Sequence, residues 1–181
     1  MTETSISERT THGINPETFA AHFSSGRIAT VSYDTFPNEF RNQVDIPSNR
    51  RALTFVITHA DGGKTYGVKD SLMDRIYLHD RSDTDKYLGH GEIDYETFDG
   101  ENKPTVGDSF TAVQDRKNGL GTRRLNMMDA LSRMVYQTPL TSGVIIHDSE
   151  KNLWEKLVEN GKAERIPSGN GPQRYRFIDK T

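Results

Sequence analysis

The sequence contains no cysteine. This absence excludes a disulfide framework, a thiolate nucleophile and a cysteine-based zinc site. The six histidines have no i,i+4 spacing that would place two imidazoles on one helix face. We therefore expect no metal site, and any chemistry must come from carboxylates, hydroxyls, imidazoles or backbone groups.

Long apolar runs are also missing. No stretch approaches the roughly 18 residues that a membrane-spanning helix needs, and the N-terminal region lacks the apolar centre of a signal peptide. We expect a cytoplasmic protein with no membrane partner.

Neither sign of charge dominates. The formal net charge is −3, so no overall positive field favours nucleic acid as a partner. Hydrophobic residues make up 33% and charged residues 27%, a polar composition that is not typical of a disordered protein. With 181 residues, the chain is expected to form a flexible tail over residues 1–13 and a single domain over residues 14–181.

The most informative local pattern is a glycine turn in the second half of the chain. The apolar run from Ser109 to Val113 predicts a strand, and Gly119 and Gly121 then allow a tight turn with positive φ before an amphipathic run. At such a strand–turn–helix junction the free N–H groups of the first helical turn can bind phosphate oxygens. Four basic residues surround it: Arg116, Lys117, Arg123 and Arg124. The alternative is ordinary turn chemistry at a helix entry.

The N-terminal half predicts one short helix and a series of strands. Pro16 fits the first helical turn after Asn15 as N-cap. Short apolar and β-branched runs separated by turn residues then indicate antiparallel hairpins. The expected strands are 27–33, 52–59, 65–68, 75–79 and 87–98, with an irregular or partly helical connection at 34–49 and a loop at 99–107.

After the glycine turn, the pattern predicts a βαβ unit. The helix at 122–136 should bury Leu125, Met128, Leu131 and Val135, while Asn126, Asp129 and Arg133 point away. A short apolar strand at 142–147 follows. A second helix, capped by Asp148 or Ser149 and stopped by Asn160-Gly161, leads to a closing hairpin of 163–166 and 174–178. The predicted fold class is therefore α/β.

Over residues 88–178 this sequence resembles the GNAT superfamily of N-acetyltransferases. The segment Arg116–Thr122 has the R-x-x-G-x-G-T pattern of that family's acyl-CoA pyrophosphate loop, and Trp154-Glu155-Lys156-Leu157 is similar to its Tyr-Glu-Lys-Leu. The resemblance implies a GNAT-like mixed central sheet with an antiparallel N-terminal meander, a βαβ cofactor unit and a C-terminal hairpin.

The resemblance also implies an activity. An amine of a small molecule or protein would attack acetyl-CoA, or another acyl-CoA, directly. The thioester would lie between the 109–113 and 142–147 strands, with a main-chain N–H near Ala112 or Val113 polarising its carbonyl. The implied cofactor-binding residues are Ala112, Val113, Arg116, Lys117, Asn118, Gly119, Leu120, Gly121, Thr122, Asn152 and Trp154.

Catalytic candidates follow from the strand at 87–98. By its two-residue period, Glu92, Asp94 and Glu96 share one face and are candidates for the base that accepts the amine proton. The alternative is a solvated strand face. Trp154 stands where the family often has the tyrosine that protonates the thiolate, and an indole cannot replace it. Tyr136 or His147 could be the acid, or could pack at element ends.

A second class of function stays open at this point. The tryptophan at position 154 and the basic cluster would also suit a non-catalytic protein with a GNAT fold that binds another protein or a nucleic acid. The net charge makes nucleic acid the less favoured partner. The sequence does not distinguish a monomer from a homodimer, and it names neither the amine acceptor nor the acyl group.

Overall fold

The computed structural model describes residues 13–44, 51–70, 72–98, 100–116, 118–144, 147–168 and 171–179. The expected tail at 1–13 thus lies almost entirely outside the described residues. Within them, no helix is long and apolar enough to cross a membrane.

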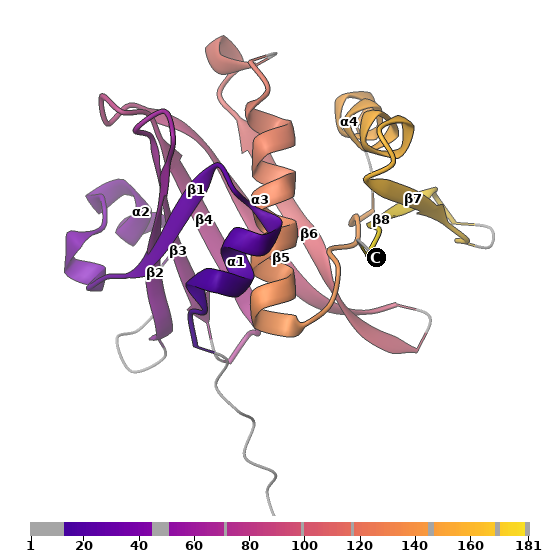
Figure 1. Cartoon of the computed structure of the whole chain (residues 1–181), viewed down its shortest axis with the longest axis horizontal. Coiled ribbons are helices and arrows are strands. Elements are labelled where there is room, and N and C mark those ends of the chain that lie inside the picture. Colours follow the sequence, from indigo (N-terminus) through magenta and orange to yellow (C-terminus); the bar gives the residue numbers. More distant parts are fainter. Residues whose placement is uncertain are drawn as a thin grey trace, which may run out of the picture.

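A six-stranded antiparallel sheet forms the centre of the protein (Figure 1). Its strands follow one another in chain order, and only β1 and β2 are joined by a long segment, residues 31–50, which contains α2. They are β1 Gly26–Thr30, β2 Arg51–His59, β3 Lys64–Asp70, β4 Arg75–Arg81, β5 Tyr87–Phe98 and β6 Glu101–Thr111. The predicted meander is therefore confirmed.

One face of this sheet is covered by two packed helices, α1 (Pro16–His22) and α3 (Leu120–Tyr136) (Figure 1). Asn15 caps α1 as predicted, because its side-chain oxygen accepts hydrogen bonds from the N–H groups of Glu17 and Thr18. The four apolar residues predicted to face the core from α3 are all buried: Leu125, Met128, Leu131 and Val135.

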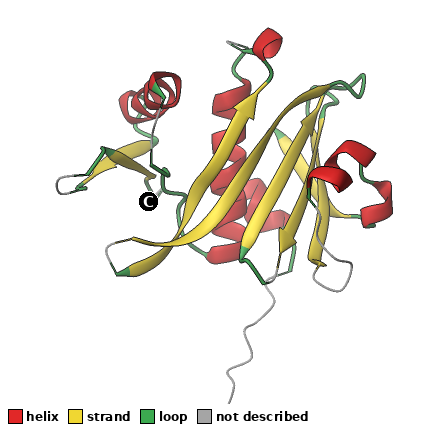
Figure 2. Cartoon of the chain, turned by 180° about the vertical axis from the view of Figure 1, so that it is seen from behind, coloured by secondary structure: helices red, strands yellow, loops and turns green. Residues whose placement is uncertain are grey.

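The opposite face is covered only in part. A 3₁₀ turn (Tyr33–Thr35) and α2 (Asn38–Gln43) bury Phe36, Phe40 and Val44 against Val68 of β3. Seen from behind, β5 and β6 have no helix over this face in the described part of the chain (Figure 2).

The C-terminal part extends the sheet beyond β6. Thr141 makes an isolated parallel bridge with Thr105 of β6 and an antiparallel bridge with Arg176. Helix α4 (Asp148–Glu159) and the hairpin of β7 (Ala163–Ile166) and β8 (Arg174–Phe177) complete the chain. The order is thus strand, helix, parallel segment, helix and hairpin, as the resemblance implies.

Two predicted segments are wrong in extent. The expected loop at 99–107 is mostly β6, because Gly100, with φ 77°, closes a tight hairpin directly after β5. In the expected strand at 142–147, the described residues 142–144 and 147 are not in a strand, and the bridges lie just before it, at Thr141. Ile145 and Ile146 lie outside the described residues, and His147, rather than Asp148 or Ser149, is the N-cap of α4.

Candidate active site

The parallel segment around Thr141 separates from β6 after two backbone hydrogen bonds. Val106 N donates to Thr141 O (3.0 Å) and Thr141 N donates to Pro104 O (2.9 Å), whereas Ser142 N already turns to Tyr175 O of β8 (2.8 Å). Residues 143–144 make no backbone hydrogen bond to β6. The stretch of β6 from 107 to 110 is exposed, and its outer edge has no backbone partner among the described residues.

A bulge at Gly107 marks the start of this open edge. The register passes from Glu92 opposite Asp108 to Ile93 opposite Val106, which leaves Gly107 without a partner on β5. A Cβ atom there would lie 2.3 Å from an Asp94 carboxylate oxygen, so any larger residue would displace this carboxylate. The bulge places the Asp94 carboxylate directly against the β6 backbone.

The N-terminus of α3 lies just beyond the end of β6. Gly119 is the N-cap, with a left-handed conformation (φ 77°, ψ 0°), no capping side chain and no acidic residue in the first turn. The first helical bond runs from Arg123 N to Gly119 O (2.9 Å), and the N–H groups of residues 120–122 have no partner among the described residues. These donors and the helix dipole are available to an anion.

Gly121 differs from the prediction, because it lies inside the first helical turn and has no positive φ. Its small size serves packing instead. A Cβ atom at this position would lie 3.3 Å from a Leu153 methyl group, which brings α4 close to the start of α3.

The predicted ring of positive charge is smaller than expected. The Arg124 guanidinium is buried against the Asp80 carboxylate (2.6 Å) and Thr111, and Arg123 pairs with Asp61 (2.5 Å). Arg116 is exposed and lies over the Phe110 ring, and Lys117 is outside the described residues. The basic cluster therefore offers little to a nucleic-acid backbone.

The N–H group of Ala112, predicted to polarise a carbonyl, is not available. It donates to Leu88 O of β5 (2.9 Å). By strand alternation, the N–H groups on the open edge of β6 belong to Ser109 and Thr111. These donors are better placed for that role than Ala112 or Val113, which starts a 3₁₀ turn.

Two of the three predicted carboxylates lie together. Arg75 reaches both Glu92 (3.1 Å) and Asp94 (2.5 Å) on the face of β5 opposite α3. Burial, then the nearby Asp94 carboxylate, raises the pKa of Glu92 to about 7. The Glu96 side chain is half exposed and forms a longer ion pair, 3.8 Å, with Arg174. It lies farther along β5 from the Gly107 bulge than Glu92 does. The structure thus favours Glu92 as a base poised near neutral pH.

The candidate acids make no hydrogen bond to these carboxylates among the described residues. Tyr136 is the last residue of α3, about 24 Å from its N-terminus, and its hydroxyl donates to Asp74 O (3.0 Å). Burial raises its pKa, which disfavours proton release. His147 is the N-cap of α4 and makes only backbone bonds to the helix.

The two residues of α4 that were predicted to bind the cofactor, Asn152 and Trp154, differ in burial. Trp154 is fully buried, stacked on Tyr175 and edge-on to Phe177, so its ring forms part of the core and presents no surface to a ligand. Asn152 is exposed. The resemblance implied that Trp154 binds the cofactor, but in the structure its ring packs in the core instead.

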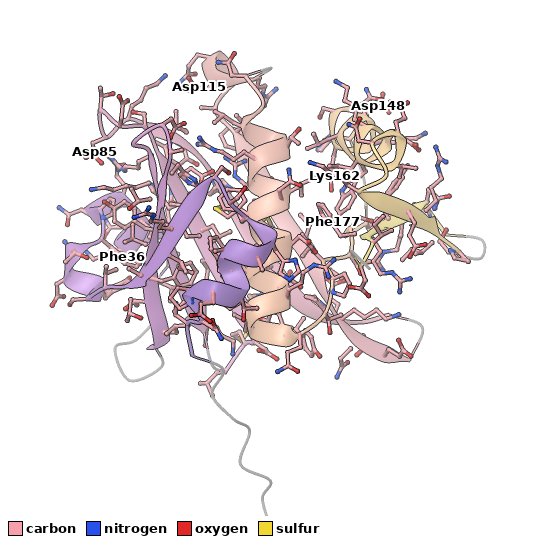
Figure 3. All side chains as sticks on the ribbon, in the orientation of Figure 1. Phe36, Asp85, Asp115, Asp148, Lys162 and Phe177 are labelled. Atoms are coloured by element: carbon pink, nitrogen blue, oxygen red, sulfur yellow. The ribbon has the colours of Figure 1, made fainter. Side chains whose placement is uncertain are left out.

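A groove of about 690 Å³ runs along the outer side of α3, between the α1–β1 turn and the end of α4 with β8. Lys162 and Phe177 line it from the α4–β8 side (Figure 3). Asp129 and Arg133 point away from the sheet, as predicted, and line this groove. Asp129 is nevertheless buried, and its carboxylate accepts a hydrogen bond from Leu140 N and pairs with Arg133. At its upper end the groove reaches Gly119 and Thr122.

With this geometry in place, the chain can be compared with known proteins. Its element order is GNAT-like. No protein-family profile matches the sequence, and no curated protein matches it. Among solved structures, a protein from Klebsiella pneumoniae subsp. pneumoniae MGH 78578 assigned as an acyl-CoA N-acyltransferase is 14% identical, with a TM-score of 0.44 over 84% of this chain and 96% of its own.

A GNAT-family acetyltransferase from Staphylococcus aureus Mu50 is 8% identical, also with a TM-score of 0.44, over 85% of this chain and 99% of its own. At these scores the likeness carries no functional weight.

Sequence reasoning missed three residues that the structure brings to the open edge: Tyr87, His90 and Asp108. They are joined by hydrogen bonds beside Glu92. The signal was absent because the expected strand began only at Ser109, after Asp108, and the bulge that places Asp108 opposite Glu92 has no pattern in the sequence.

Proposed function

We propose that this protein is an acyl-CoA-dependent N-acyltransferase that transfers an acetyl group to a primary amine. The observation that carries the proposal is the open edge of β6, which begins at the Gly107 bulge and ends beside the uncapped N-terminus of α3. A thioester with a pantetheine arm needs both features. The arm can add to a free strand edge, and the pyrophosphate can bind free helical N–H groups.

The residues present fit such a substrate. The N–H groups of Leu120, Gly121 and Thr122 would hold the pyrophosphate, and Arg116 is exposed nearby to add charge. The groove along α3 begins at Gly119 and Thr122, so it offers room for the nucleotide end. The N–H groups of Ser109 and Thr111 would face the pantetheine amides and the thioester carbonyl.

Glu92 would act as the base. It accepts a proton from the acceptor's ammonium group, the freed nitrogen lone pair forms the C–N bond, and the C–S bond breaks. The departing thiolate takes a proton from solvent. A thiol with a pKa near 8.5 is an adequate leaving group without an enzyme acid.

The binding half of the proposal is tested by calorimetric titration with acetyl-CoA and CoA. We expect dissociation constants between about 1 µM and a few hundred µM, or about 5–8 kcal/mol. Gly119→Val should weaken binding at least about tenfold, because a β-branched residue resists the left-handed N-cap conformation that directs the N–H groups.

Gly119→Asn is the matched control, because asparagine tolerates the left-handed region and the space around a Cβ atom at this position is open. It should bind CoA nearly as well as the natural protein. Equal affinity of the natural protein and Gly119→Val would show that the ligand is not held at this helix terminus.

A further inference from the structure

A hydrogen-bonded row of three side chains lies on the face of the sheet opposite α3. Tyr87 Oη lies 2.6 Å from His90 Nδ1, and His90 Nε2 lies 3.0 Å from Asp108 Oδ2. When the phenol donates to Nδ1, Nε2 carries the imidazole proton and donates it to the carboxylate. The row therefore has one consistent direction of donation that ends at Asp108.

Stacked rings hold the imidazole in this orientation. The His90 ring lies between the rings of Tyr87 and Phe110, with centroids 6.4 Å and 5.4 Å away and both planes within 22° of parallel. Two hydrogen bonds and two ring contacts leave His90 little rotational freedom. Such fixed geometry is what a group that orients another group requires.

Asp108 is the first residue after the Gly107 bulge, at the start of the open edge of β6. It lies directly opposite Glu92 of β5, so their Cβ atoms are about 5 Å apart. The two carboxylates have different surroundings. The Asp108 side chain is 62% exposed, whereas that of Glu92 is 22% exposed and contacts Arg75.

We propose that Asp108, oriented by His90, anchors the ammonium group of the acceptor while Glu92 removes its proton. This assignment rests on the proposed acyltransferase function. It makes Asp108 a substrate-binding residue and His90 a positioning residue, and it identifies the acceptor as a primary amine that arrives protonated.

The difference in surroundings explains the division of roles. A carboxylate that meets a cation at the surface must be accessible and correctly aimed, and Asp108 is both. A base must be partly withdrawn from water so that it takes up a proton near neutral pH, and burial together with Asp94 does this for Glu92. Two adjacent carboxylates with opposite environments are a common arrangement for separate roles in one reaction.

The test is a steady-state comparison of thiol release from acetyl-CoA with butylamine, putrescine and a lysine-containing peptide as acceptors. Asp108→Asn should raise the KM for the best of these amines about tenfold or more, with kcat within about threefold of the natural protein. His90→Gln should shift KM in the same direction by less. The KM for acetyl-CoA should stay unchanged in both.

Two controls keep the result specific. Asp83→Asn makes the same charge change at an exposed position of the β4–β5 turn and should leave KM unaltered. Asp108→Glu retains the charge and should recover part of the lost affinity. Thermal melting of each variant confirms that the fold is retained.

The inference is overturned if Asp108→Asn lowers kcat at constant KM, or alters neither constant, while the natural protein turns over. If the natural protein neither binds acetyl-CoA nor acetylates any of these amines, the acyltransferase function fails first, and the role of Asp108 fails with it.

Discussion

Glu92→Gln is expected to lower kcat about 100-fold while leaving the affinity for acetyl-CoA unchanged. Glutamine keeps the size of the side chain but cannot accept the ammonium proton. Because only the deprotonated carboxylate is a base, and its pKa is raised to about 7, kcat/KM of the natural protein should increase as pH rises through 7 and then level off. Glu92→Gln should lose this limb of the profile.

Two neighbours on β5 serve as comparisons for that experiment. The Asp94 carboxylate helps to raise the pKa of Glu92, so Asp94→Asn should shift the limb to lower pH without removing it. Glu96→Gln alters a half-exposed carboxylate far from the bulge and should have little effect. If Glu92→Gln retains full activity and the same pH profile, the base is another group.

Asp80→Ala is expected to reduce the free energy of unfolding by about 3–5 kcal/mol. It leaves the Arg124 guanidinium, which is 1% exposed, without its counter-charge inside the protein. It also removes the acceptor for the Thr65 hydroxyl, which in turn contacts His59. Glycines on β5 make room for this arginine, since a Cβ atom at Gly89 would lie 2.5 Å from it.

Denaturation by urea measures this effect, with Asp85→Ala as the control. Asp85 pairs with Arg81 but is 75% exposed, so loss of the ion pair should cost at most about 1 kcal/mol, to which alanine at its left-handed backbone (φ 63°) adds about 1 kcal/mol. Combining Asp80→Leu with Arg124→Met should recover much of the stability, because no unpaired charge then remains buried. Similar midpoints for Asp80→Ala and Asp85→Ala would contradict the role assigned to the buried pair.

Local patterns were sufficient to predict most of the fold. Asn15-Pro16 gave the start of α1, and the apolar periodicity of residues 125–135 gave the buried face of α3. Asp61-Gly62 and the alternation on either side of it gave the β2–β3 hairpin. Each of these signals depends on residues within a few positions of one another, which a sequence shows directly.

Features that depend on pairing across the sheet could not be predicted. The segment from Glu101 to Thr105 is polar and contains Pro104, so it has the composition of a loop. Only its hydrogen-bonded pairing with β5 makes it a strand. Nothing local shows that Arg124 turns inward to Asp80 or that Asp129 accepts a hydrogen bond from Leu140 N.

The site shows the same limit. The R-x-x-G-x-G pattern located the helix terminus correctly, and the alternation of β5 placed Glu92 and Asp94 on one face. The open edge, by contrast, is created by the divergence of residues 142–144 from β6, and the partnership of His90 with Asp108 depends on the bulge at Gly107. Tyr136 lies at the far end of α3 from the anion site, a separation that follows from the length of the helix, and its role as an acid stays a prediction.

The most direct test of the central claim is to incubate the protein with acetyl-CoA and each amine of the panel, and to follow both free thiol and the acetylated amine by mass spectrometry. Acyl transfer predicts that one acetyl-amine forms for each thiol released, at a rate that depends on protein concentration and falls about 100-fold in Glu92→Gln. Thiol release without acetyl-amine, or no reaction above the protein-free control, would contradict the account.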